Sequence, residues 1–354
     1  MFDITYEEIL ERMLDRIPDS MDKREGSVIY DALAPAAAEL QIMYIELDNV
    51  MNETFADTAS RDWLIRRVAE RGISPKPATN AILKGEFIPT TLEIPIGSRF
   101  TCGDLTYSVK TMISGGTYQV ECETVGTLGN QNFGQLIPID YISGLETATL
   151  TELLIPAEDE EDTEALRDRY FNSLKSQAFG GNVADYKEKV VAISGVGGCK
   201  VFPVENGAGT VGICIIASDW SVPSSTLIDE VQNIIDPEGH SGEGYGLAPI
   251  GHTVTVYGCE NVVINITADI TYAQGWSWDA AKPYIEEAVN NYFTELASSW
   301  DRNDALVVRI AQIDARLLNL DCILDIANTK LNGNPSNIQL DSKQIPKKGT
   351  INGN

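Results

Sequence analysis

The side chains that could do chemistry are few and scattered. The sequence holds two histidines, His240 and His252, and neither stands at a metal-ligand spacing such as His-Glu-x-x-His. His240 lies in a glycine-rich stretch, residues 236–246, that superficially resembles a phosphate-binding loop. This stretch holds three acidic residues and no Lys or Arg, so it would repel a phosphate group. We interpret it as a mobile connection.

Nucleophilic chemistry also lacks its usual companions. Ser20-Met-Asp-Lys23 has the Ser-x-x-Lys spacing, but it falls in a charged turn, and neither companion motif of the serine acyltransferases occurs. The six cysteines form no Cys-x-x-Cys pair, and we interpret them as free buried thiols in a reducing compartment. The sequence therefore predicts no catalytic, cofactor-binding or metal-binding residue.

Carboxylates are the one abundant reactive group. Asp and Glu number 52 against 26 Lys and Arg, which gives a net charge of -26. This charge argues against nucleic acid and anionic membrane surfaces as partners, and it favours docking onto basic protein surfaces. The acidic run Glu158–Asp162 lacks the ligand spacing and central glycine of a calcium loop, so we interpret it as carboxylates at the N-terminus of the helix that follows.

The start of the chain gives no export signal. It reads Met1-Phe-Asp-Ile-Thr-Tyr-Glu-Glu8, without the basic and then apolar order of a secretory signal. No apolar run approaches the length of a bilayer span. We predict a soluble protein that does not leave the cell by the general secretory route.

The sequence predicts that residues 1–75 form a helical oligomerisation segment. Thr5 can cap a first helix, and a third helix runs from Ser60 to Arg71. Between them, a longer helix carries apolar residues at alternating spacings of four and three, which form a heptad seam: Leu33, Ala37, Leu40, Tyr44, Leu47 and Met51. Pro35 implies that this helix either starts near Ala34 or kinks. On pattern alone, we favour packing within its own domain over a coiled coil between chains.

The sequence pattern of the rest of the chain predicts strands mixed with helices. Residues 76–155 hold about five short strands with tight turns and form a small β-rich sandwich or barrel-like module. Two α/β units follow at 156–258 and 259–330, and the strand Val262–Tyr272 should bury one face. The predicted fold class is α+β multidomain: an N-terminal helical segment, the β-rich module and C-terminal tandem α/β sandwich units. Residues 331–354 form a basic C-terminal extension that either clips onto a neighbouring subunit or is a solvated terminus.

Short motifs in a fixed order now suggest a family. They are Thr58-Ala-Ser-Arg-Asp-Trp-Leu64 with Gly72-Ile73 and Ala78-Thr-Asn-Ala81, Gly85-Glu-Phe87, Ile94-Pro-Ile-Gly97, Gly126-Thr-Leu-Gly-Asn130 with Gly134, Leu166-Arg-Asp-Arg169, Gly181-Asn-Val-Ala-Asp-Tyr186, Gly195-Val196 and Ala248-Pro-Ile-Gly251. In this order the chain resembles the baseplate J-like family of contractile phage tails and phage-tail-like bacteriocins. Pro156-Ala157 departs from the paired glycine of that family.

The resemblance implies a structural role without a cofactor. In this family, two J-like chains join one different wedge protein through bundled helices, and the wedges form a sixfold ring around the hub and spike. They contact the sheath initiator and relay the contraction trigger. The resemblance further implies assembly in the bacterial cytoplasm and incorporation into the tail baseplate. In this context we favour the heptad seam as an interface between chains, with the β-rich module as an outward arm.

Two other classes of function remain as alternatives. The first is a tail-associated enzyme that acts on carbohydrate or peptidoglycan through a carboxylate cleft. Such an enzyme should show convergent carboxylates of perturbed pKa in a pocket, whereas a wedge subunit should expose extended apolar faces. The second is a cell-surface adhesion module, against which the missing signal and the free cysteines argue.

Overall fold

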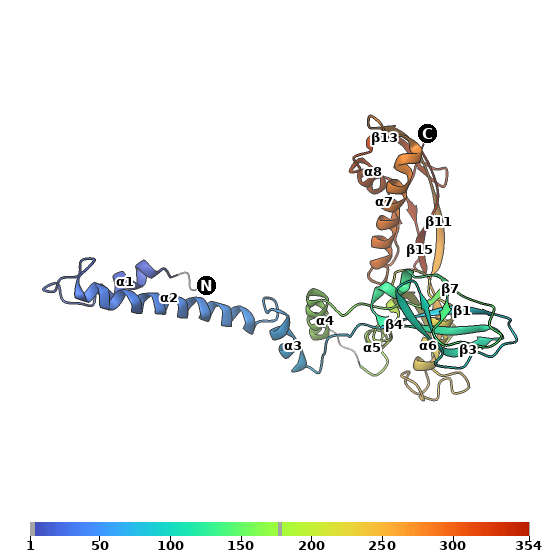
Figure 1. Cartoon of the computed structure of the whole chain (residues 1–354), viewed down its shortest axis with the longest axis horizontal. Helices are drawn as coiled ribbons and strands as arrows, with labels where there is room; N and C mark the ends of the chain where they lie inside the picture. Colours follow the sequence, from blue (N-terminus) through green and yellow to red (C-terminus); the bar gives the residue numbers. More distant parts are fainter. Residues whose placement is uncertain (1–3, 176–178, 354) are drawn as a thin grey trace. The chain divides into compact units, whose positions relative to one another are not determined.

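The computed structural model describes residues 4–175 and 179–353 (Figure 1). The chain divides into two compact units. The first comprises Met1–Pro77 and Glu161–Ser176, and the second comprises Ala78–Glu160 and Gln177–Asn354. The chain therefore leaves the first unit, builds a β-rich module, returns for one helix, and then completes the second unit. Helices and strands occur together as the predicted α+β class requires.

The first unit is helical. Its helices are α1 (Tyr6–Leu14), α2 (Val28–Thr54), α3 (Arg61–Ala69) and α4 (Thr163–Lys175). The predicted cap of α1 is confirmed: the Glu8 amide donates to Thr5 Oγ1 at 3.2 Å, and the Thr5 amide donates to the Glu8 carboxylate at 3.0 Å. Helix α2 begins after Ser27 and continues through Pro35, so the predicted start near Ala34 is wrong. The Ser27 cap starts the helix, and its later turns continue past the proline.

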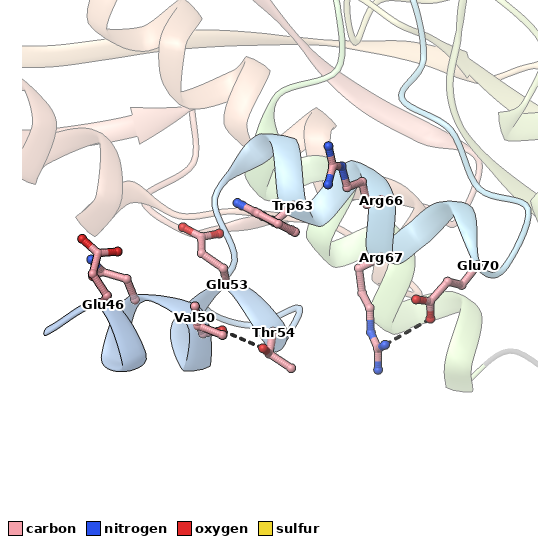
Figure 2. A pocket seen from close by; sticks show the side chains of 9 residues that line it. Glu46, Val50, Glu53, Thr54, Trp63, Arg66, Arg67 and Glu70 are labelled. Atoms are coloured by element: carbon pink, nitrogen blue, oxygen red, sulfur yellow. Dashed lines mark hydrogen bonds and ion pairs between the residues drawn. The ribbon is translucent and has the colours of Figure 1, made fainter. Parts of the chain in front are cut away.

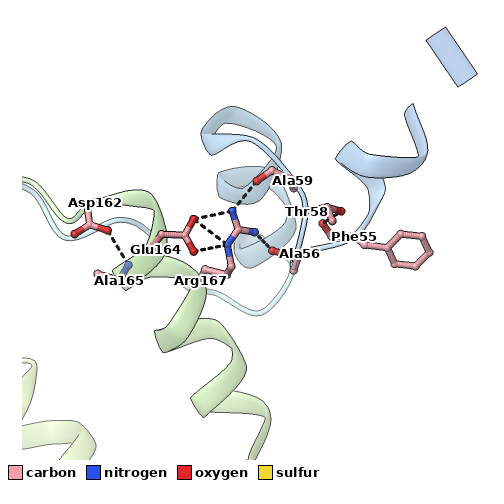
Figure 3. A network of polar contacts seen from close by, with 8 residues as sticks. All are labelled: Phe55, Ala56, Thr58, Ala59, Asp162, Glu164, Ala165 and Arg167. Carbon is pink, nitrogen blue, oxygen red and sulfur yellow. Dashed lines mark hydrogen bonds and ion pairs between the residues drawn. The ribbon is translucent and has the colours of Figure 1, made fainter. Parts of the chain in front are cut away.

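Helix α4 packs in the first unit through Arg167 (Figure 3). The Arg167 guanidinium donates to the carbonyl oxygens of Ala56 and Ala59, the second at 2.9 Å. The Ala165 amide donates to the Asp162 carboxylate at 2.8 Å, so the predicted helix-capping role of the acidic run is confirmed for Asp162. Glu161 pairs with Arg169 at 2.7 Å. The predicted end of this helix near Gln177 lies outside the described residues.

The β-rich module is one seven-stranded sheet. Its strands are β1 (Asn80–Ile88), β2 (Arg99–Cys102), β3 (Leu105–Ser114), β4 (Thr117–Val125), β5 (Gly134–Gln135), β6 (Ile137–Pro138) and β7 (Thr147–Ile155), and their order is β5-β7-β1-β4-β3-β2-β6. The consecutive short strands β5 and β6 sit at opposite edges, with buried Leu136 between them. The chain thus passes from one edge of the sheet to the other within a few residues, and whether the module is better described as a sandwich or as a barrel-like unit stays a prediction. Strand β7 was not predicted, although Ala148 and Leu150 alternate with threonines there.

A three-stranded sheet follows. Strands β8 (Val196–Pro203) and β9 (Thr210–Ala217) form an antiparallel hairpin, and β10 (Thr253–Gly258) pairs parallel with β9 after helix α6 (Ser225–Ile235). Helix α5 (Val183–Val191) packs on β8. Ile213 and Ile215 of β9 belong to the core shared with α5 and α6.

The last sheet has the order β13-β11-β15. Its elements are β11 (Glu260–Tyr272), β13 (Ile323–Leu331), β15 (Gln344–Gly353), the helices α7 (Trp278–Ser298) and α8 (Ile310–Leu318), the short pair β12 (Val307–Val308) and β14 (Ile338–Gln339), and the 3-10 turn η2 (Trp300–Arg302). The predicted buried face of β11 is confirmed by Ile264, Ile266 and Ala268, which pack under α7 and α8.

The C-terminal segment is part of this sheet. Residues 331–354 were predicted as a basic extension, but β15 pairs parallel with β11 along most of its length. Ile345 and Ile351 are buried in the sheet, whereas Lys347 is exposed. Pro346 and Gly349 interrupt the strand pattern, and this explains why the sequence indicated an extension. The basic residues lie on an edge strand, where lysine side chains disfavour pairing with strands of other chains.

Candidate interaction surface on the N-terminal helices

Helix α1 covers only part of the predicted seam on α2. Ile9 and Leu10 of α1 are buried against Ala37, with Leu33 and Tyr44 half-buried around them. The remaining predicted interface residues are Leu40, Leu47 and Met51. Leu40 is 36% exposed and Leu47 is 42% exposed, and Met51 is half-buried. The structure therefore divides the seam into a part covered within the chain and a part left open.

Helix α2 also exposes apolar residues away from the seam. Ile42, Met43, Ile45 and Val50 are 51%, 65%, 55% and 59% exposed. At 3.6 residues per turn, Ile42 lies about 160° around the helix from Leu40, and Ile45 is placed likewise with respect to Leu47. A helix that is apolar on nearly all sides is normally buried on all sides. We therefore define the bare surface as Leu40, Ile42, Met43, Ile45, Leu47 and Val50.

The sequence analysis did not identify the residues of the bare surface that lie outside the heptad seam. A single heptad template selects one stripe, and it passes over Ile42, Met43, Ile45 and Val50. The signal was nevertheless present, because the stretch Ile42-Met-Tyr-Ile45 has no polar position that could face water on one side. Fully burying a side chain such as Leu or Ile contributes about 1.5–3 kcal/mol, so covering this surface would stabilise an assembly strongly.

An open cleft of about 510 Å³ lies between the end of α2 and helix α3 (Figure 2). Three glutamates line it, Glu46, Glu53 and Glu70, and the last two have structural partners. The Glu53 carboxylate accepts hydrogen bonds from the Ser60 amide at 2.7 Å and the Ser60 hydroxyl at 2.8 Å, and Glu70 pairs with Arg67 at 3.1 Å. Glu53 and Glu70 are thus engaged in contacts within the chain. Within residues 4–175 and 179–353, no group of three or more His, Cys, Asp or Glu could hold a metal ion.

The cleft also exposes an aromatic side chain. Trp63 is 47% exposed, and the Arg66 guanidinium lies 4.8 Å from its ring centroid (Figure 2). A cation over a ring face stabilises both side chains in this position. Trp63 thereby adds apolar surface next to Val50, the last residue of the bare surface. The cleft therefore adds apolar surface beside the end of α2.

The glycine-rich stretch around His240 is organised by one buried carboxylate. Asp236 accepts from the Ser241 hydroxyl at 2.5 Å, the Gly242 amide at 3.0 Å and the Val254 amide at 2.8 Å. These bonds anchor the start of the stretch to β10, and the mobility of the rest of the connection stays a prediction. His240 pairs with Glu243 at 2.9 Å. The second histidine, His252, bonds through Nδ1 to the Tyr186 hydroxyl at 2.8 Å, so the two histidines serve separate contacts.

All six cysteines are free and buried, as predicted: Cys102, Cys122, Cys199, Cys214, Cys259 and Cys322. Burial raises the pKa of Cys199 and of Cys259 to about 12. It also raises the pKa of Cys102 and Cys214. Thiols held in this protonated state are poor nucleophiles, because the thiolate is the reactive form.

The helices of the described chain include none that could cross a bilayer. In residues 4–175 and 179–353, none combines the length and the hydropathy that a membrane span needs. The longest of them, α2, is apolar but carries several acidic residues along its length.

Comparison with known proteins identifies a family for the chain. A family model of the baseplate J-like central domain matches residues 178–258, and a model of the baseplate J-like protein C-terminal domain matches residues 264–354. Phage-like element PBSX protein XkdT of Bacillus subtilis (strain 168) is 42% identical over 351 residues, which cover 99% of this chain and 97% of that protein. The uncharacterized protein YqbT of the same organism is 43% identical with the same coverage. Baseplate protein gp47 of Escherichia phage Mu is 25% identical over 269 residues, or 72% of each chain.

These matches define the class: a baseplate-related structural protein of a phage tail or tail-like particle. More narrowly, the chain belongs to the baseplate J-like family, as its motifs indicated. The two family models also meet close to the predicted boundary between the α/β units, since the first ends at residue 258 and the second begins at residue 264.

Proposed function

We propose that this chain is a wedge subunit of the baseplate and that other chains cover the bare surface of α2. The observation that carries the proposal is the exposure of apolar residues on opposite sides of one long helix. Contiguous exposed apolar surface of this kind marks an interaction site. A second copy of the chain and a different wedge protein could each cover one side, as in a bundle of helices.

In this proposal, the wedges form a sixfold ring around the hub and spike and contact the sheath initiator. The β-rich module acts as an outward arm. Contraction re-docks the wedges as rigid bodies, and no covalent bond changes in this chain. The subunit assembles in the bacterial cytoplasm and becomes part of the particle, with neither nucleic acid nor membrane as partner. Family membership and the structural partners of Glu53 and Glu70 support a role without catalysis, in preference to a carbohydrate- or peptidoglycan-acting enzyme.

The test replaces Leu40 and Leu47 with Asp and co-expresses the variant with the other tail proteins. We expect a folded second unit but no complex, because two desolvated carboxylates would destabilise the helix bundle. Affinity purification through a tag on this chain measures which partners remain bound. Unchanged co-purification would refute the interface.

A matched control places the same charges elsewhere. Ile137 and Ile139 of the β-rich module are 59% and 48% exposed, so Ile137→Asp with Ile139→Asp adds two carboxylates without touching α2. This control should keep the complex. A third variant, Ile42→Asp with Ile45→Asp, tests the opposite side of the helix. If this side meets a different chain, the variant should lose a different partner from the one lost with Leu40 and Leu47.

A further inference from the structure

Two lysines cross the boundary between the central and C-terminal domains in opposite directions. Lys200 lies on β8 in the central domain and reaches into the C-terminal one. Lys343 lies just before β15 in the C-terminal domain and reaches back into the central one. We infer that these lysines lock the two domains into a single rigid block, so that the C-terminal domain cannot turn independently of the central domain. The inference concerns the chain itself and does not depend on the proposed partners.

Lys200 is held entirely by the C-terminal domain. Its Nζ donates to the carbonyl oxygen of Ser342 at 2.8 Å and of Asp304 at 3.2 Å, and it lies 4.7 Å from the ring centroid of Trp300. The residue is 8% exposed, and this burial lowers its pKa. A small rotation of one domain would leave the buried ammonium without partners, which costs more than the loss of the hydrogen bonds alone. The contact therefore resists sliding as well as separation.

Lys343 makes the reciprocal contact. Its ammonium pairs with the Glu205 carboxylate and lies 4.4 Å from the ring centroid of Tyr257 and 4.7 Å from that of Phe202. The Tyr257 hydroxyl also donates to Glu205 at 2.9 Å. All three partners belong to the central domain. One ammonium thus joins a carboxylate and two ring faces, an arrangement that fixes both its position and its direction.

The apolar core is continuous across the same boundary. Cys214 and Ile216 of β9 are fully buried in the core that contains Ile264 and Trp300 of the C-terminal domain. Their neighbours on the other face of β9 belong to the core under α5 and α6. Strand β9 therefore contributes one face to each core. Separation of the domains would expose apolar residues of β9, so the boundary is built as an interior and differs from a hinge with a wet interface.

The buried cysteines give a built-in probe for this inference. Cys214 and Cys259 lie in the core that spans the boundary, Cys322 lies in the same core at the start of β13, and Cys102 and Cys122 lie in the β-rich module. The experiment measures the rate of iodoacetamide modification of each cysteine in the native full-length chain by mass spectrometry. We expect Cys214 and Cys259 to react no faster than Cys322 in the unmodified protein, because the block opens as one.

The double variant Lys200→Met with Lys343→Met keeps the aliphatic stems and removes both charges. We expect it to react about tenfold faster or more at Cys214 and Cys259, as for the loss of one or two charged hydrogen bonds. Cys102 and Cys122 should keep their rates. The control is Lys347→Met, which removes an exposed charge from β15 and should change none of the rates.

Two results would overturn the inference. One is faster reaction of Cys214 and Cys259 than of Cys322 in the unmodified chain, which would show domains that already part. The other is a double variant with unchanged rates at those cysteines. If the modification rates of all six cysteines rise together, the double variant unfolds globally. The milder Lys343→Met variant is then tested in the same way, and unchanged rates at Cys214 and Cys259 would overturn the inference.

Discussion

Helices α2 and α7 are both long and rich in apolar residues, but they use those residues differently. Helix α7 has 21 residues, and its buried positions, among them Ile285, Val289 and Phe293, lie on one face against the C-terminal sheet. Helix α2 has 27 residues, of which only Ala37 is buried. A helix with one apolar face finds its cover within the chain. A helix that is apolar on several faces has too few neighbours in the chain, and this difference supports the proposal that other subunits cover α2.

Equivalent truncations on the two helices test most directly whether α7 is covered within the chain and α2 is not. Ile285→Ala should lower the free energy of unfolding by about 2–5 kcal/mol, because it leaves a cavity in a closed core. Ile45→Ala should change it by less than about 0.5 kcal/mol, because that side chain is exposed in the single chain. Urea unfolding of the purified chain, repeated at several protein concentrations, measures both values. A large, concentration-independent loss for Ile45→Ala would mean that α2 is already covered within the chain.

Sequence reasoning reached most of this contrast, and its failures have physical reasons. The alternation of β11, the hairpin of β8 and β9 and the inward face of α7 were predictable, because each has one periodic pattern and one buried side. Strand β15 was missed because Pro346 and the adjacent lysines obscure the pattern of an edge strand. The second side of α2 was missed because a heptad template detects one stripe. Lys200 and Lys343 each contact residues of the other domain that lie more than 100 positions away in the sequence. Local sequence patterns cannot show such contacts.

A second prediction compares the apolar surface of α2 with a charged contact, the ion pair between Glu205 and Lys343. Burial raises the pKa of Glu205, but hydrogen bonds from Lys343 and Tyr257 and the charge of Lys343 outweigh it and hold the pKa below its usual value. The stability contributed by this ionised carboxylate is therefore complete above the unfolded-state pKa of glutamate. It is lost as the pH falls through the lowered pKa of the folded state.

The measurement is the difference in unfolding free energy between the unmodified chain and Glu205→Gln, from pH 7 to pH 3. We expect a difference of about 1 kcal/mol at neutral pH, since Lys343 and Glu205 are partly exposed, and a smaller one in acid. Tyr257→Phe keeps the ring against Lys343 and removes one hydrogen bond, so it should show a weaker form of the same trend. A difference that stays constant over this pH range would mean that Glu205 does not titrate as part of the contact.

The smallest expected effect separates the covered part of α2 from its bare surface. Thr5→Ala removes the side-chain oxygen that accepts from the Glu8 amide, and loss of an N-terminal cap costs about 1 kcal/mol. Helix α1 should then fray from Ala37 and expose Tyr44, while the second unit keeps its stability. Hydrogen exchange read by mass spectrometry would show faster exchange in residues 6–14 alone. Because Leu40 and Leu47 do not depend on α1, partner binding should survive this change, and a loss of binding equal to that of the Leu40 and Leu47 variant would place α1 inside the interface as well.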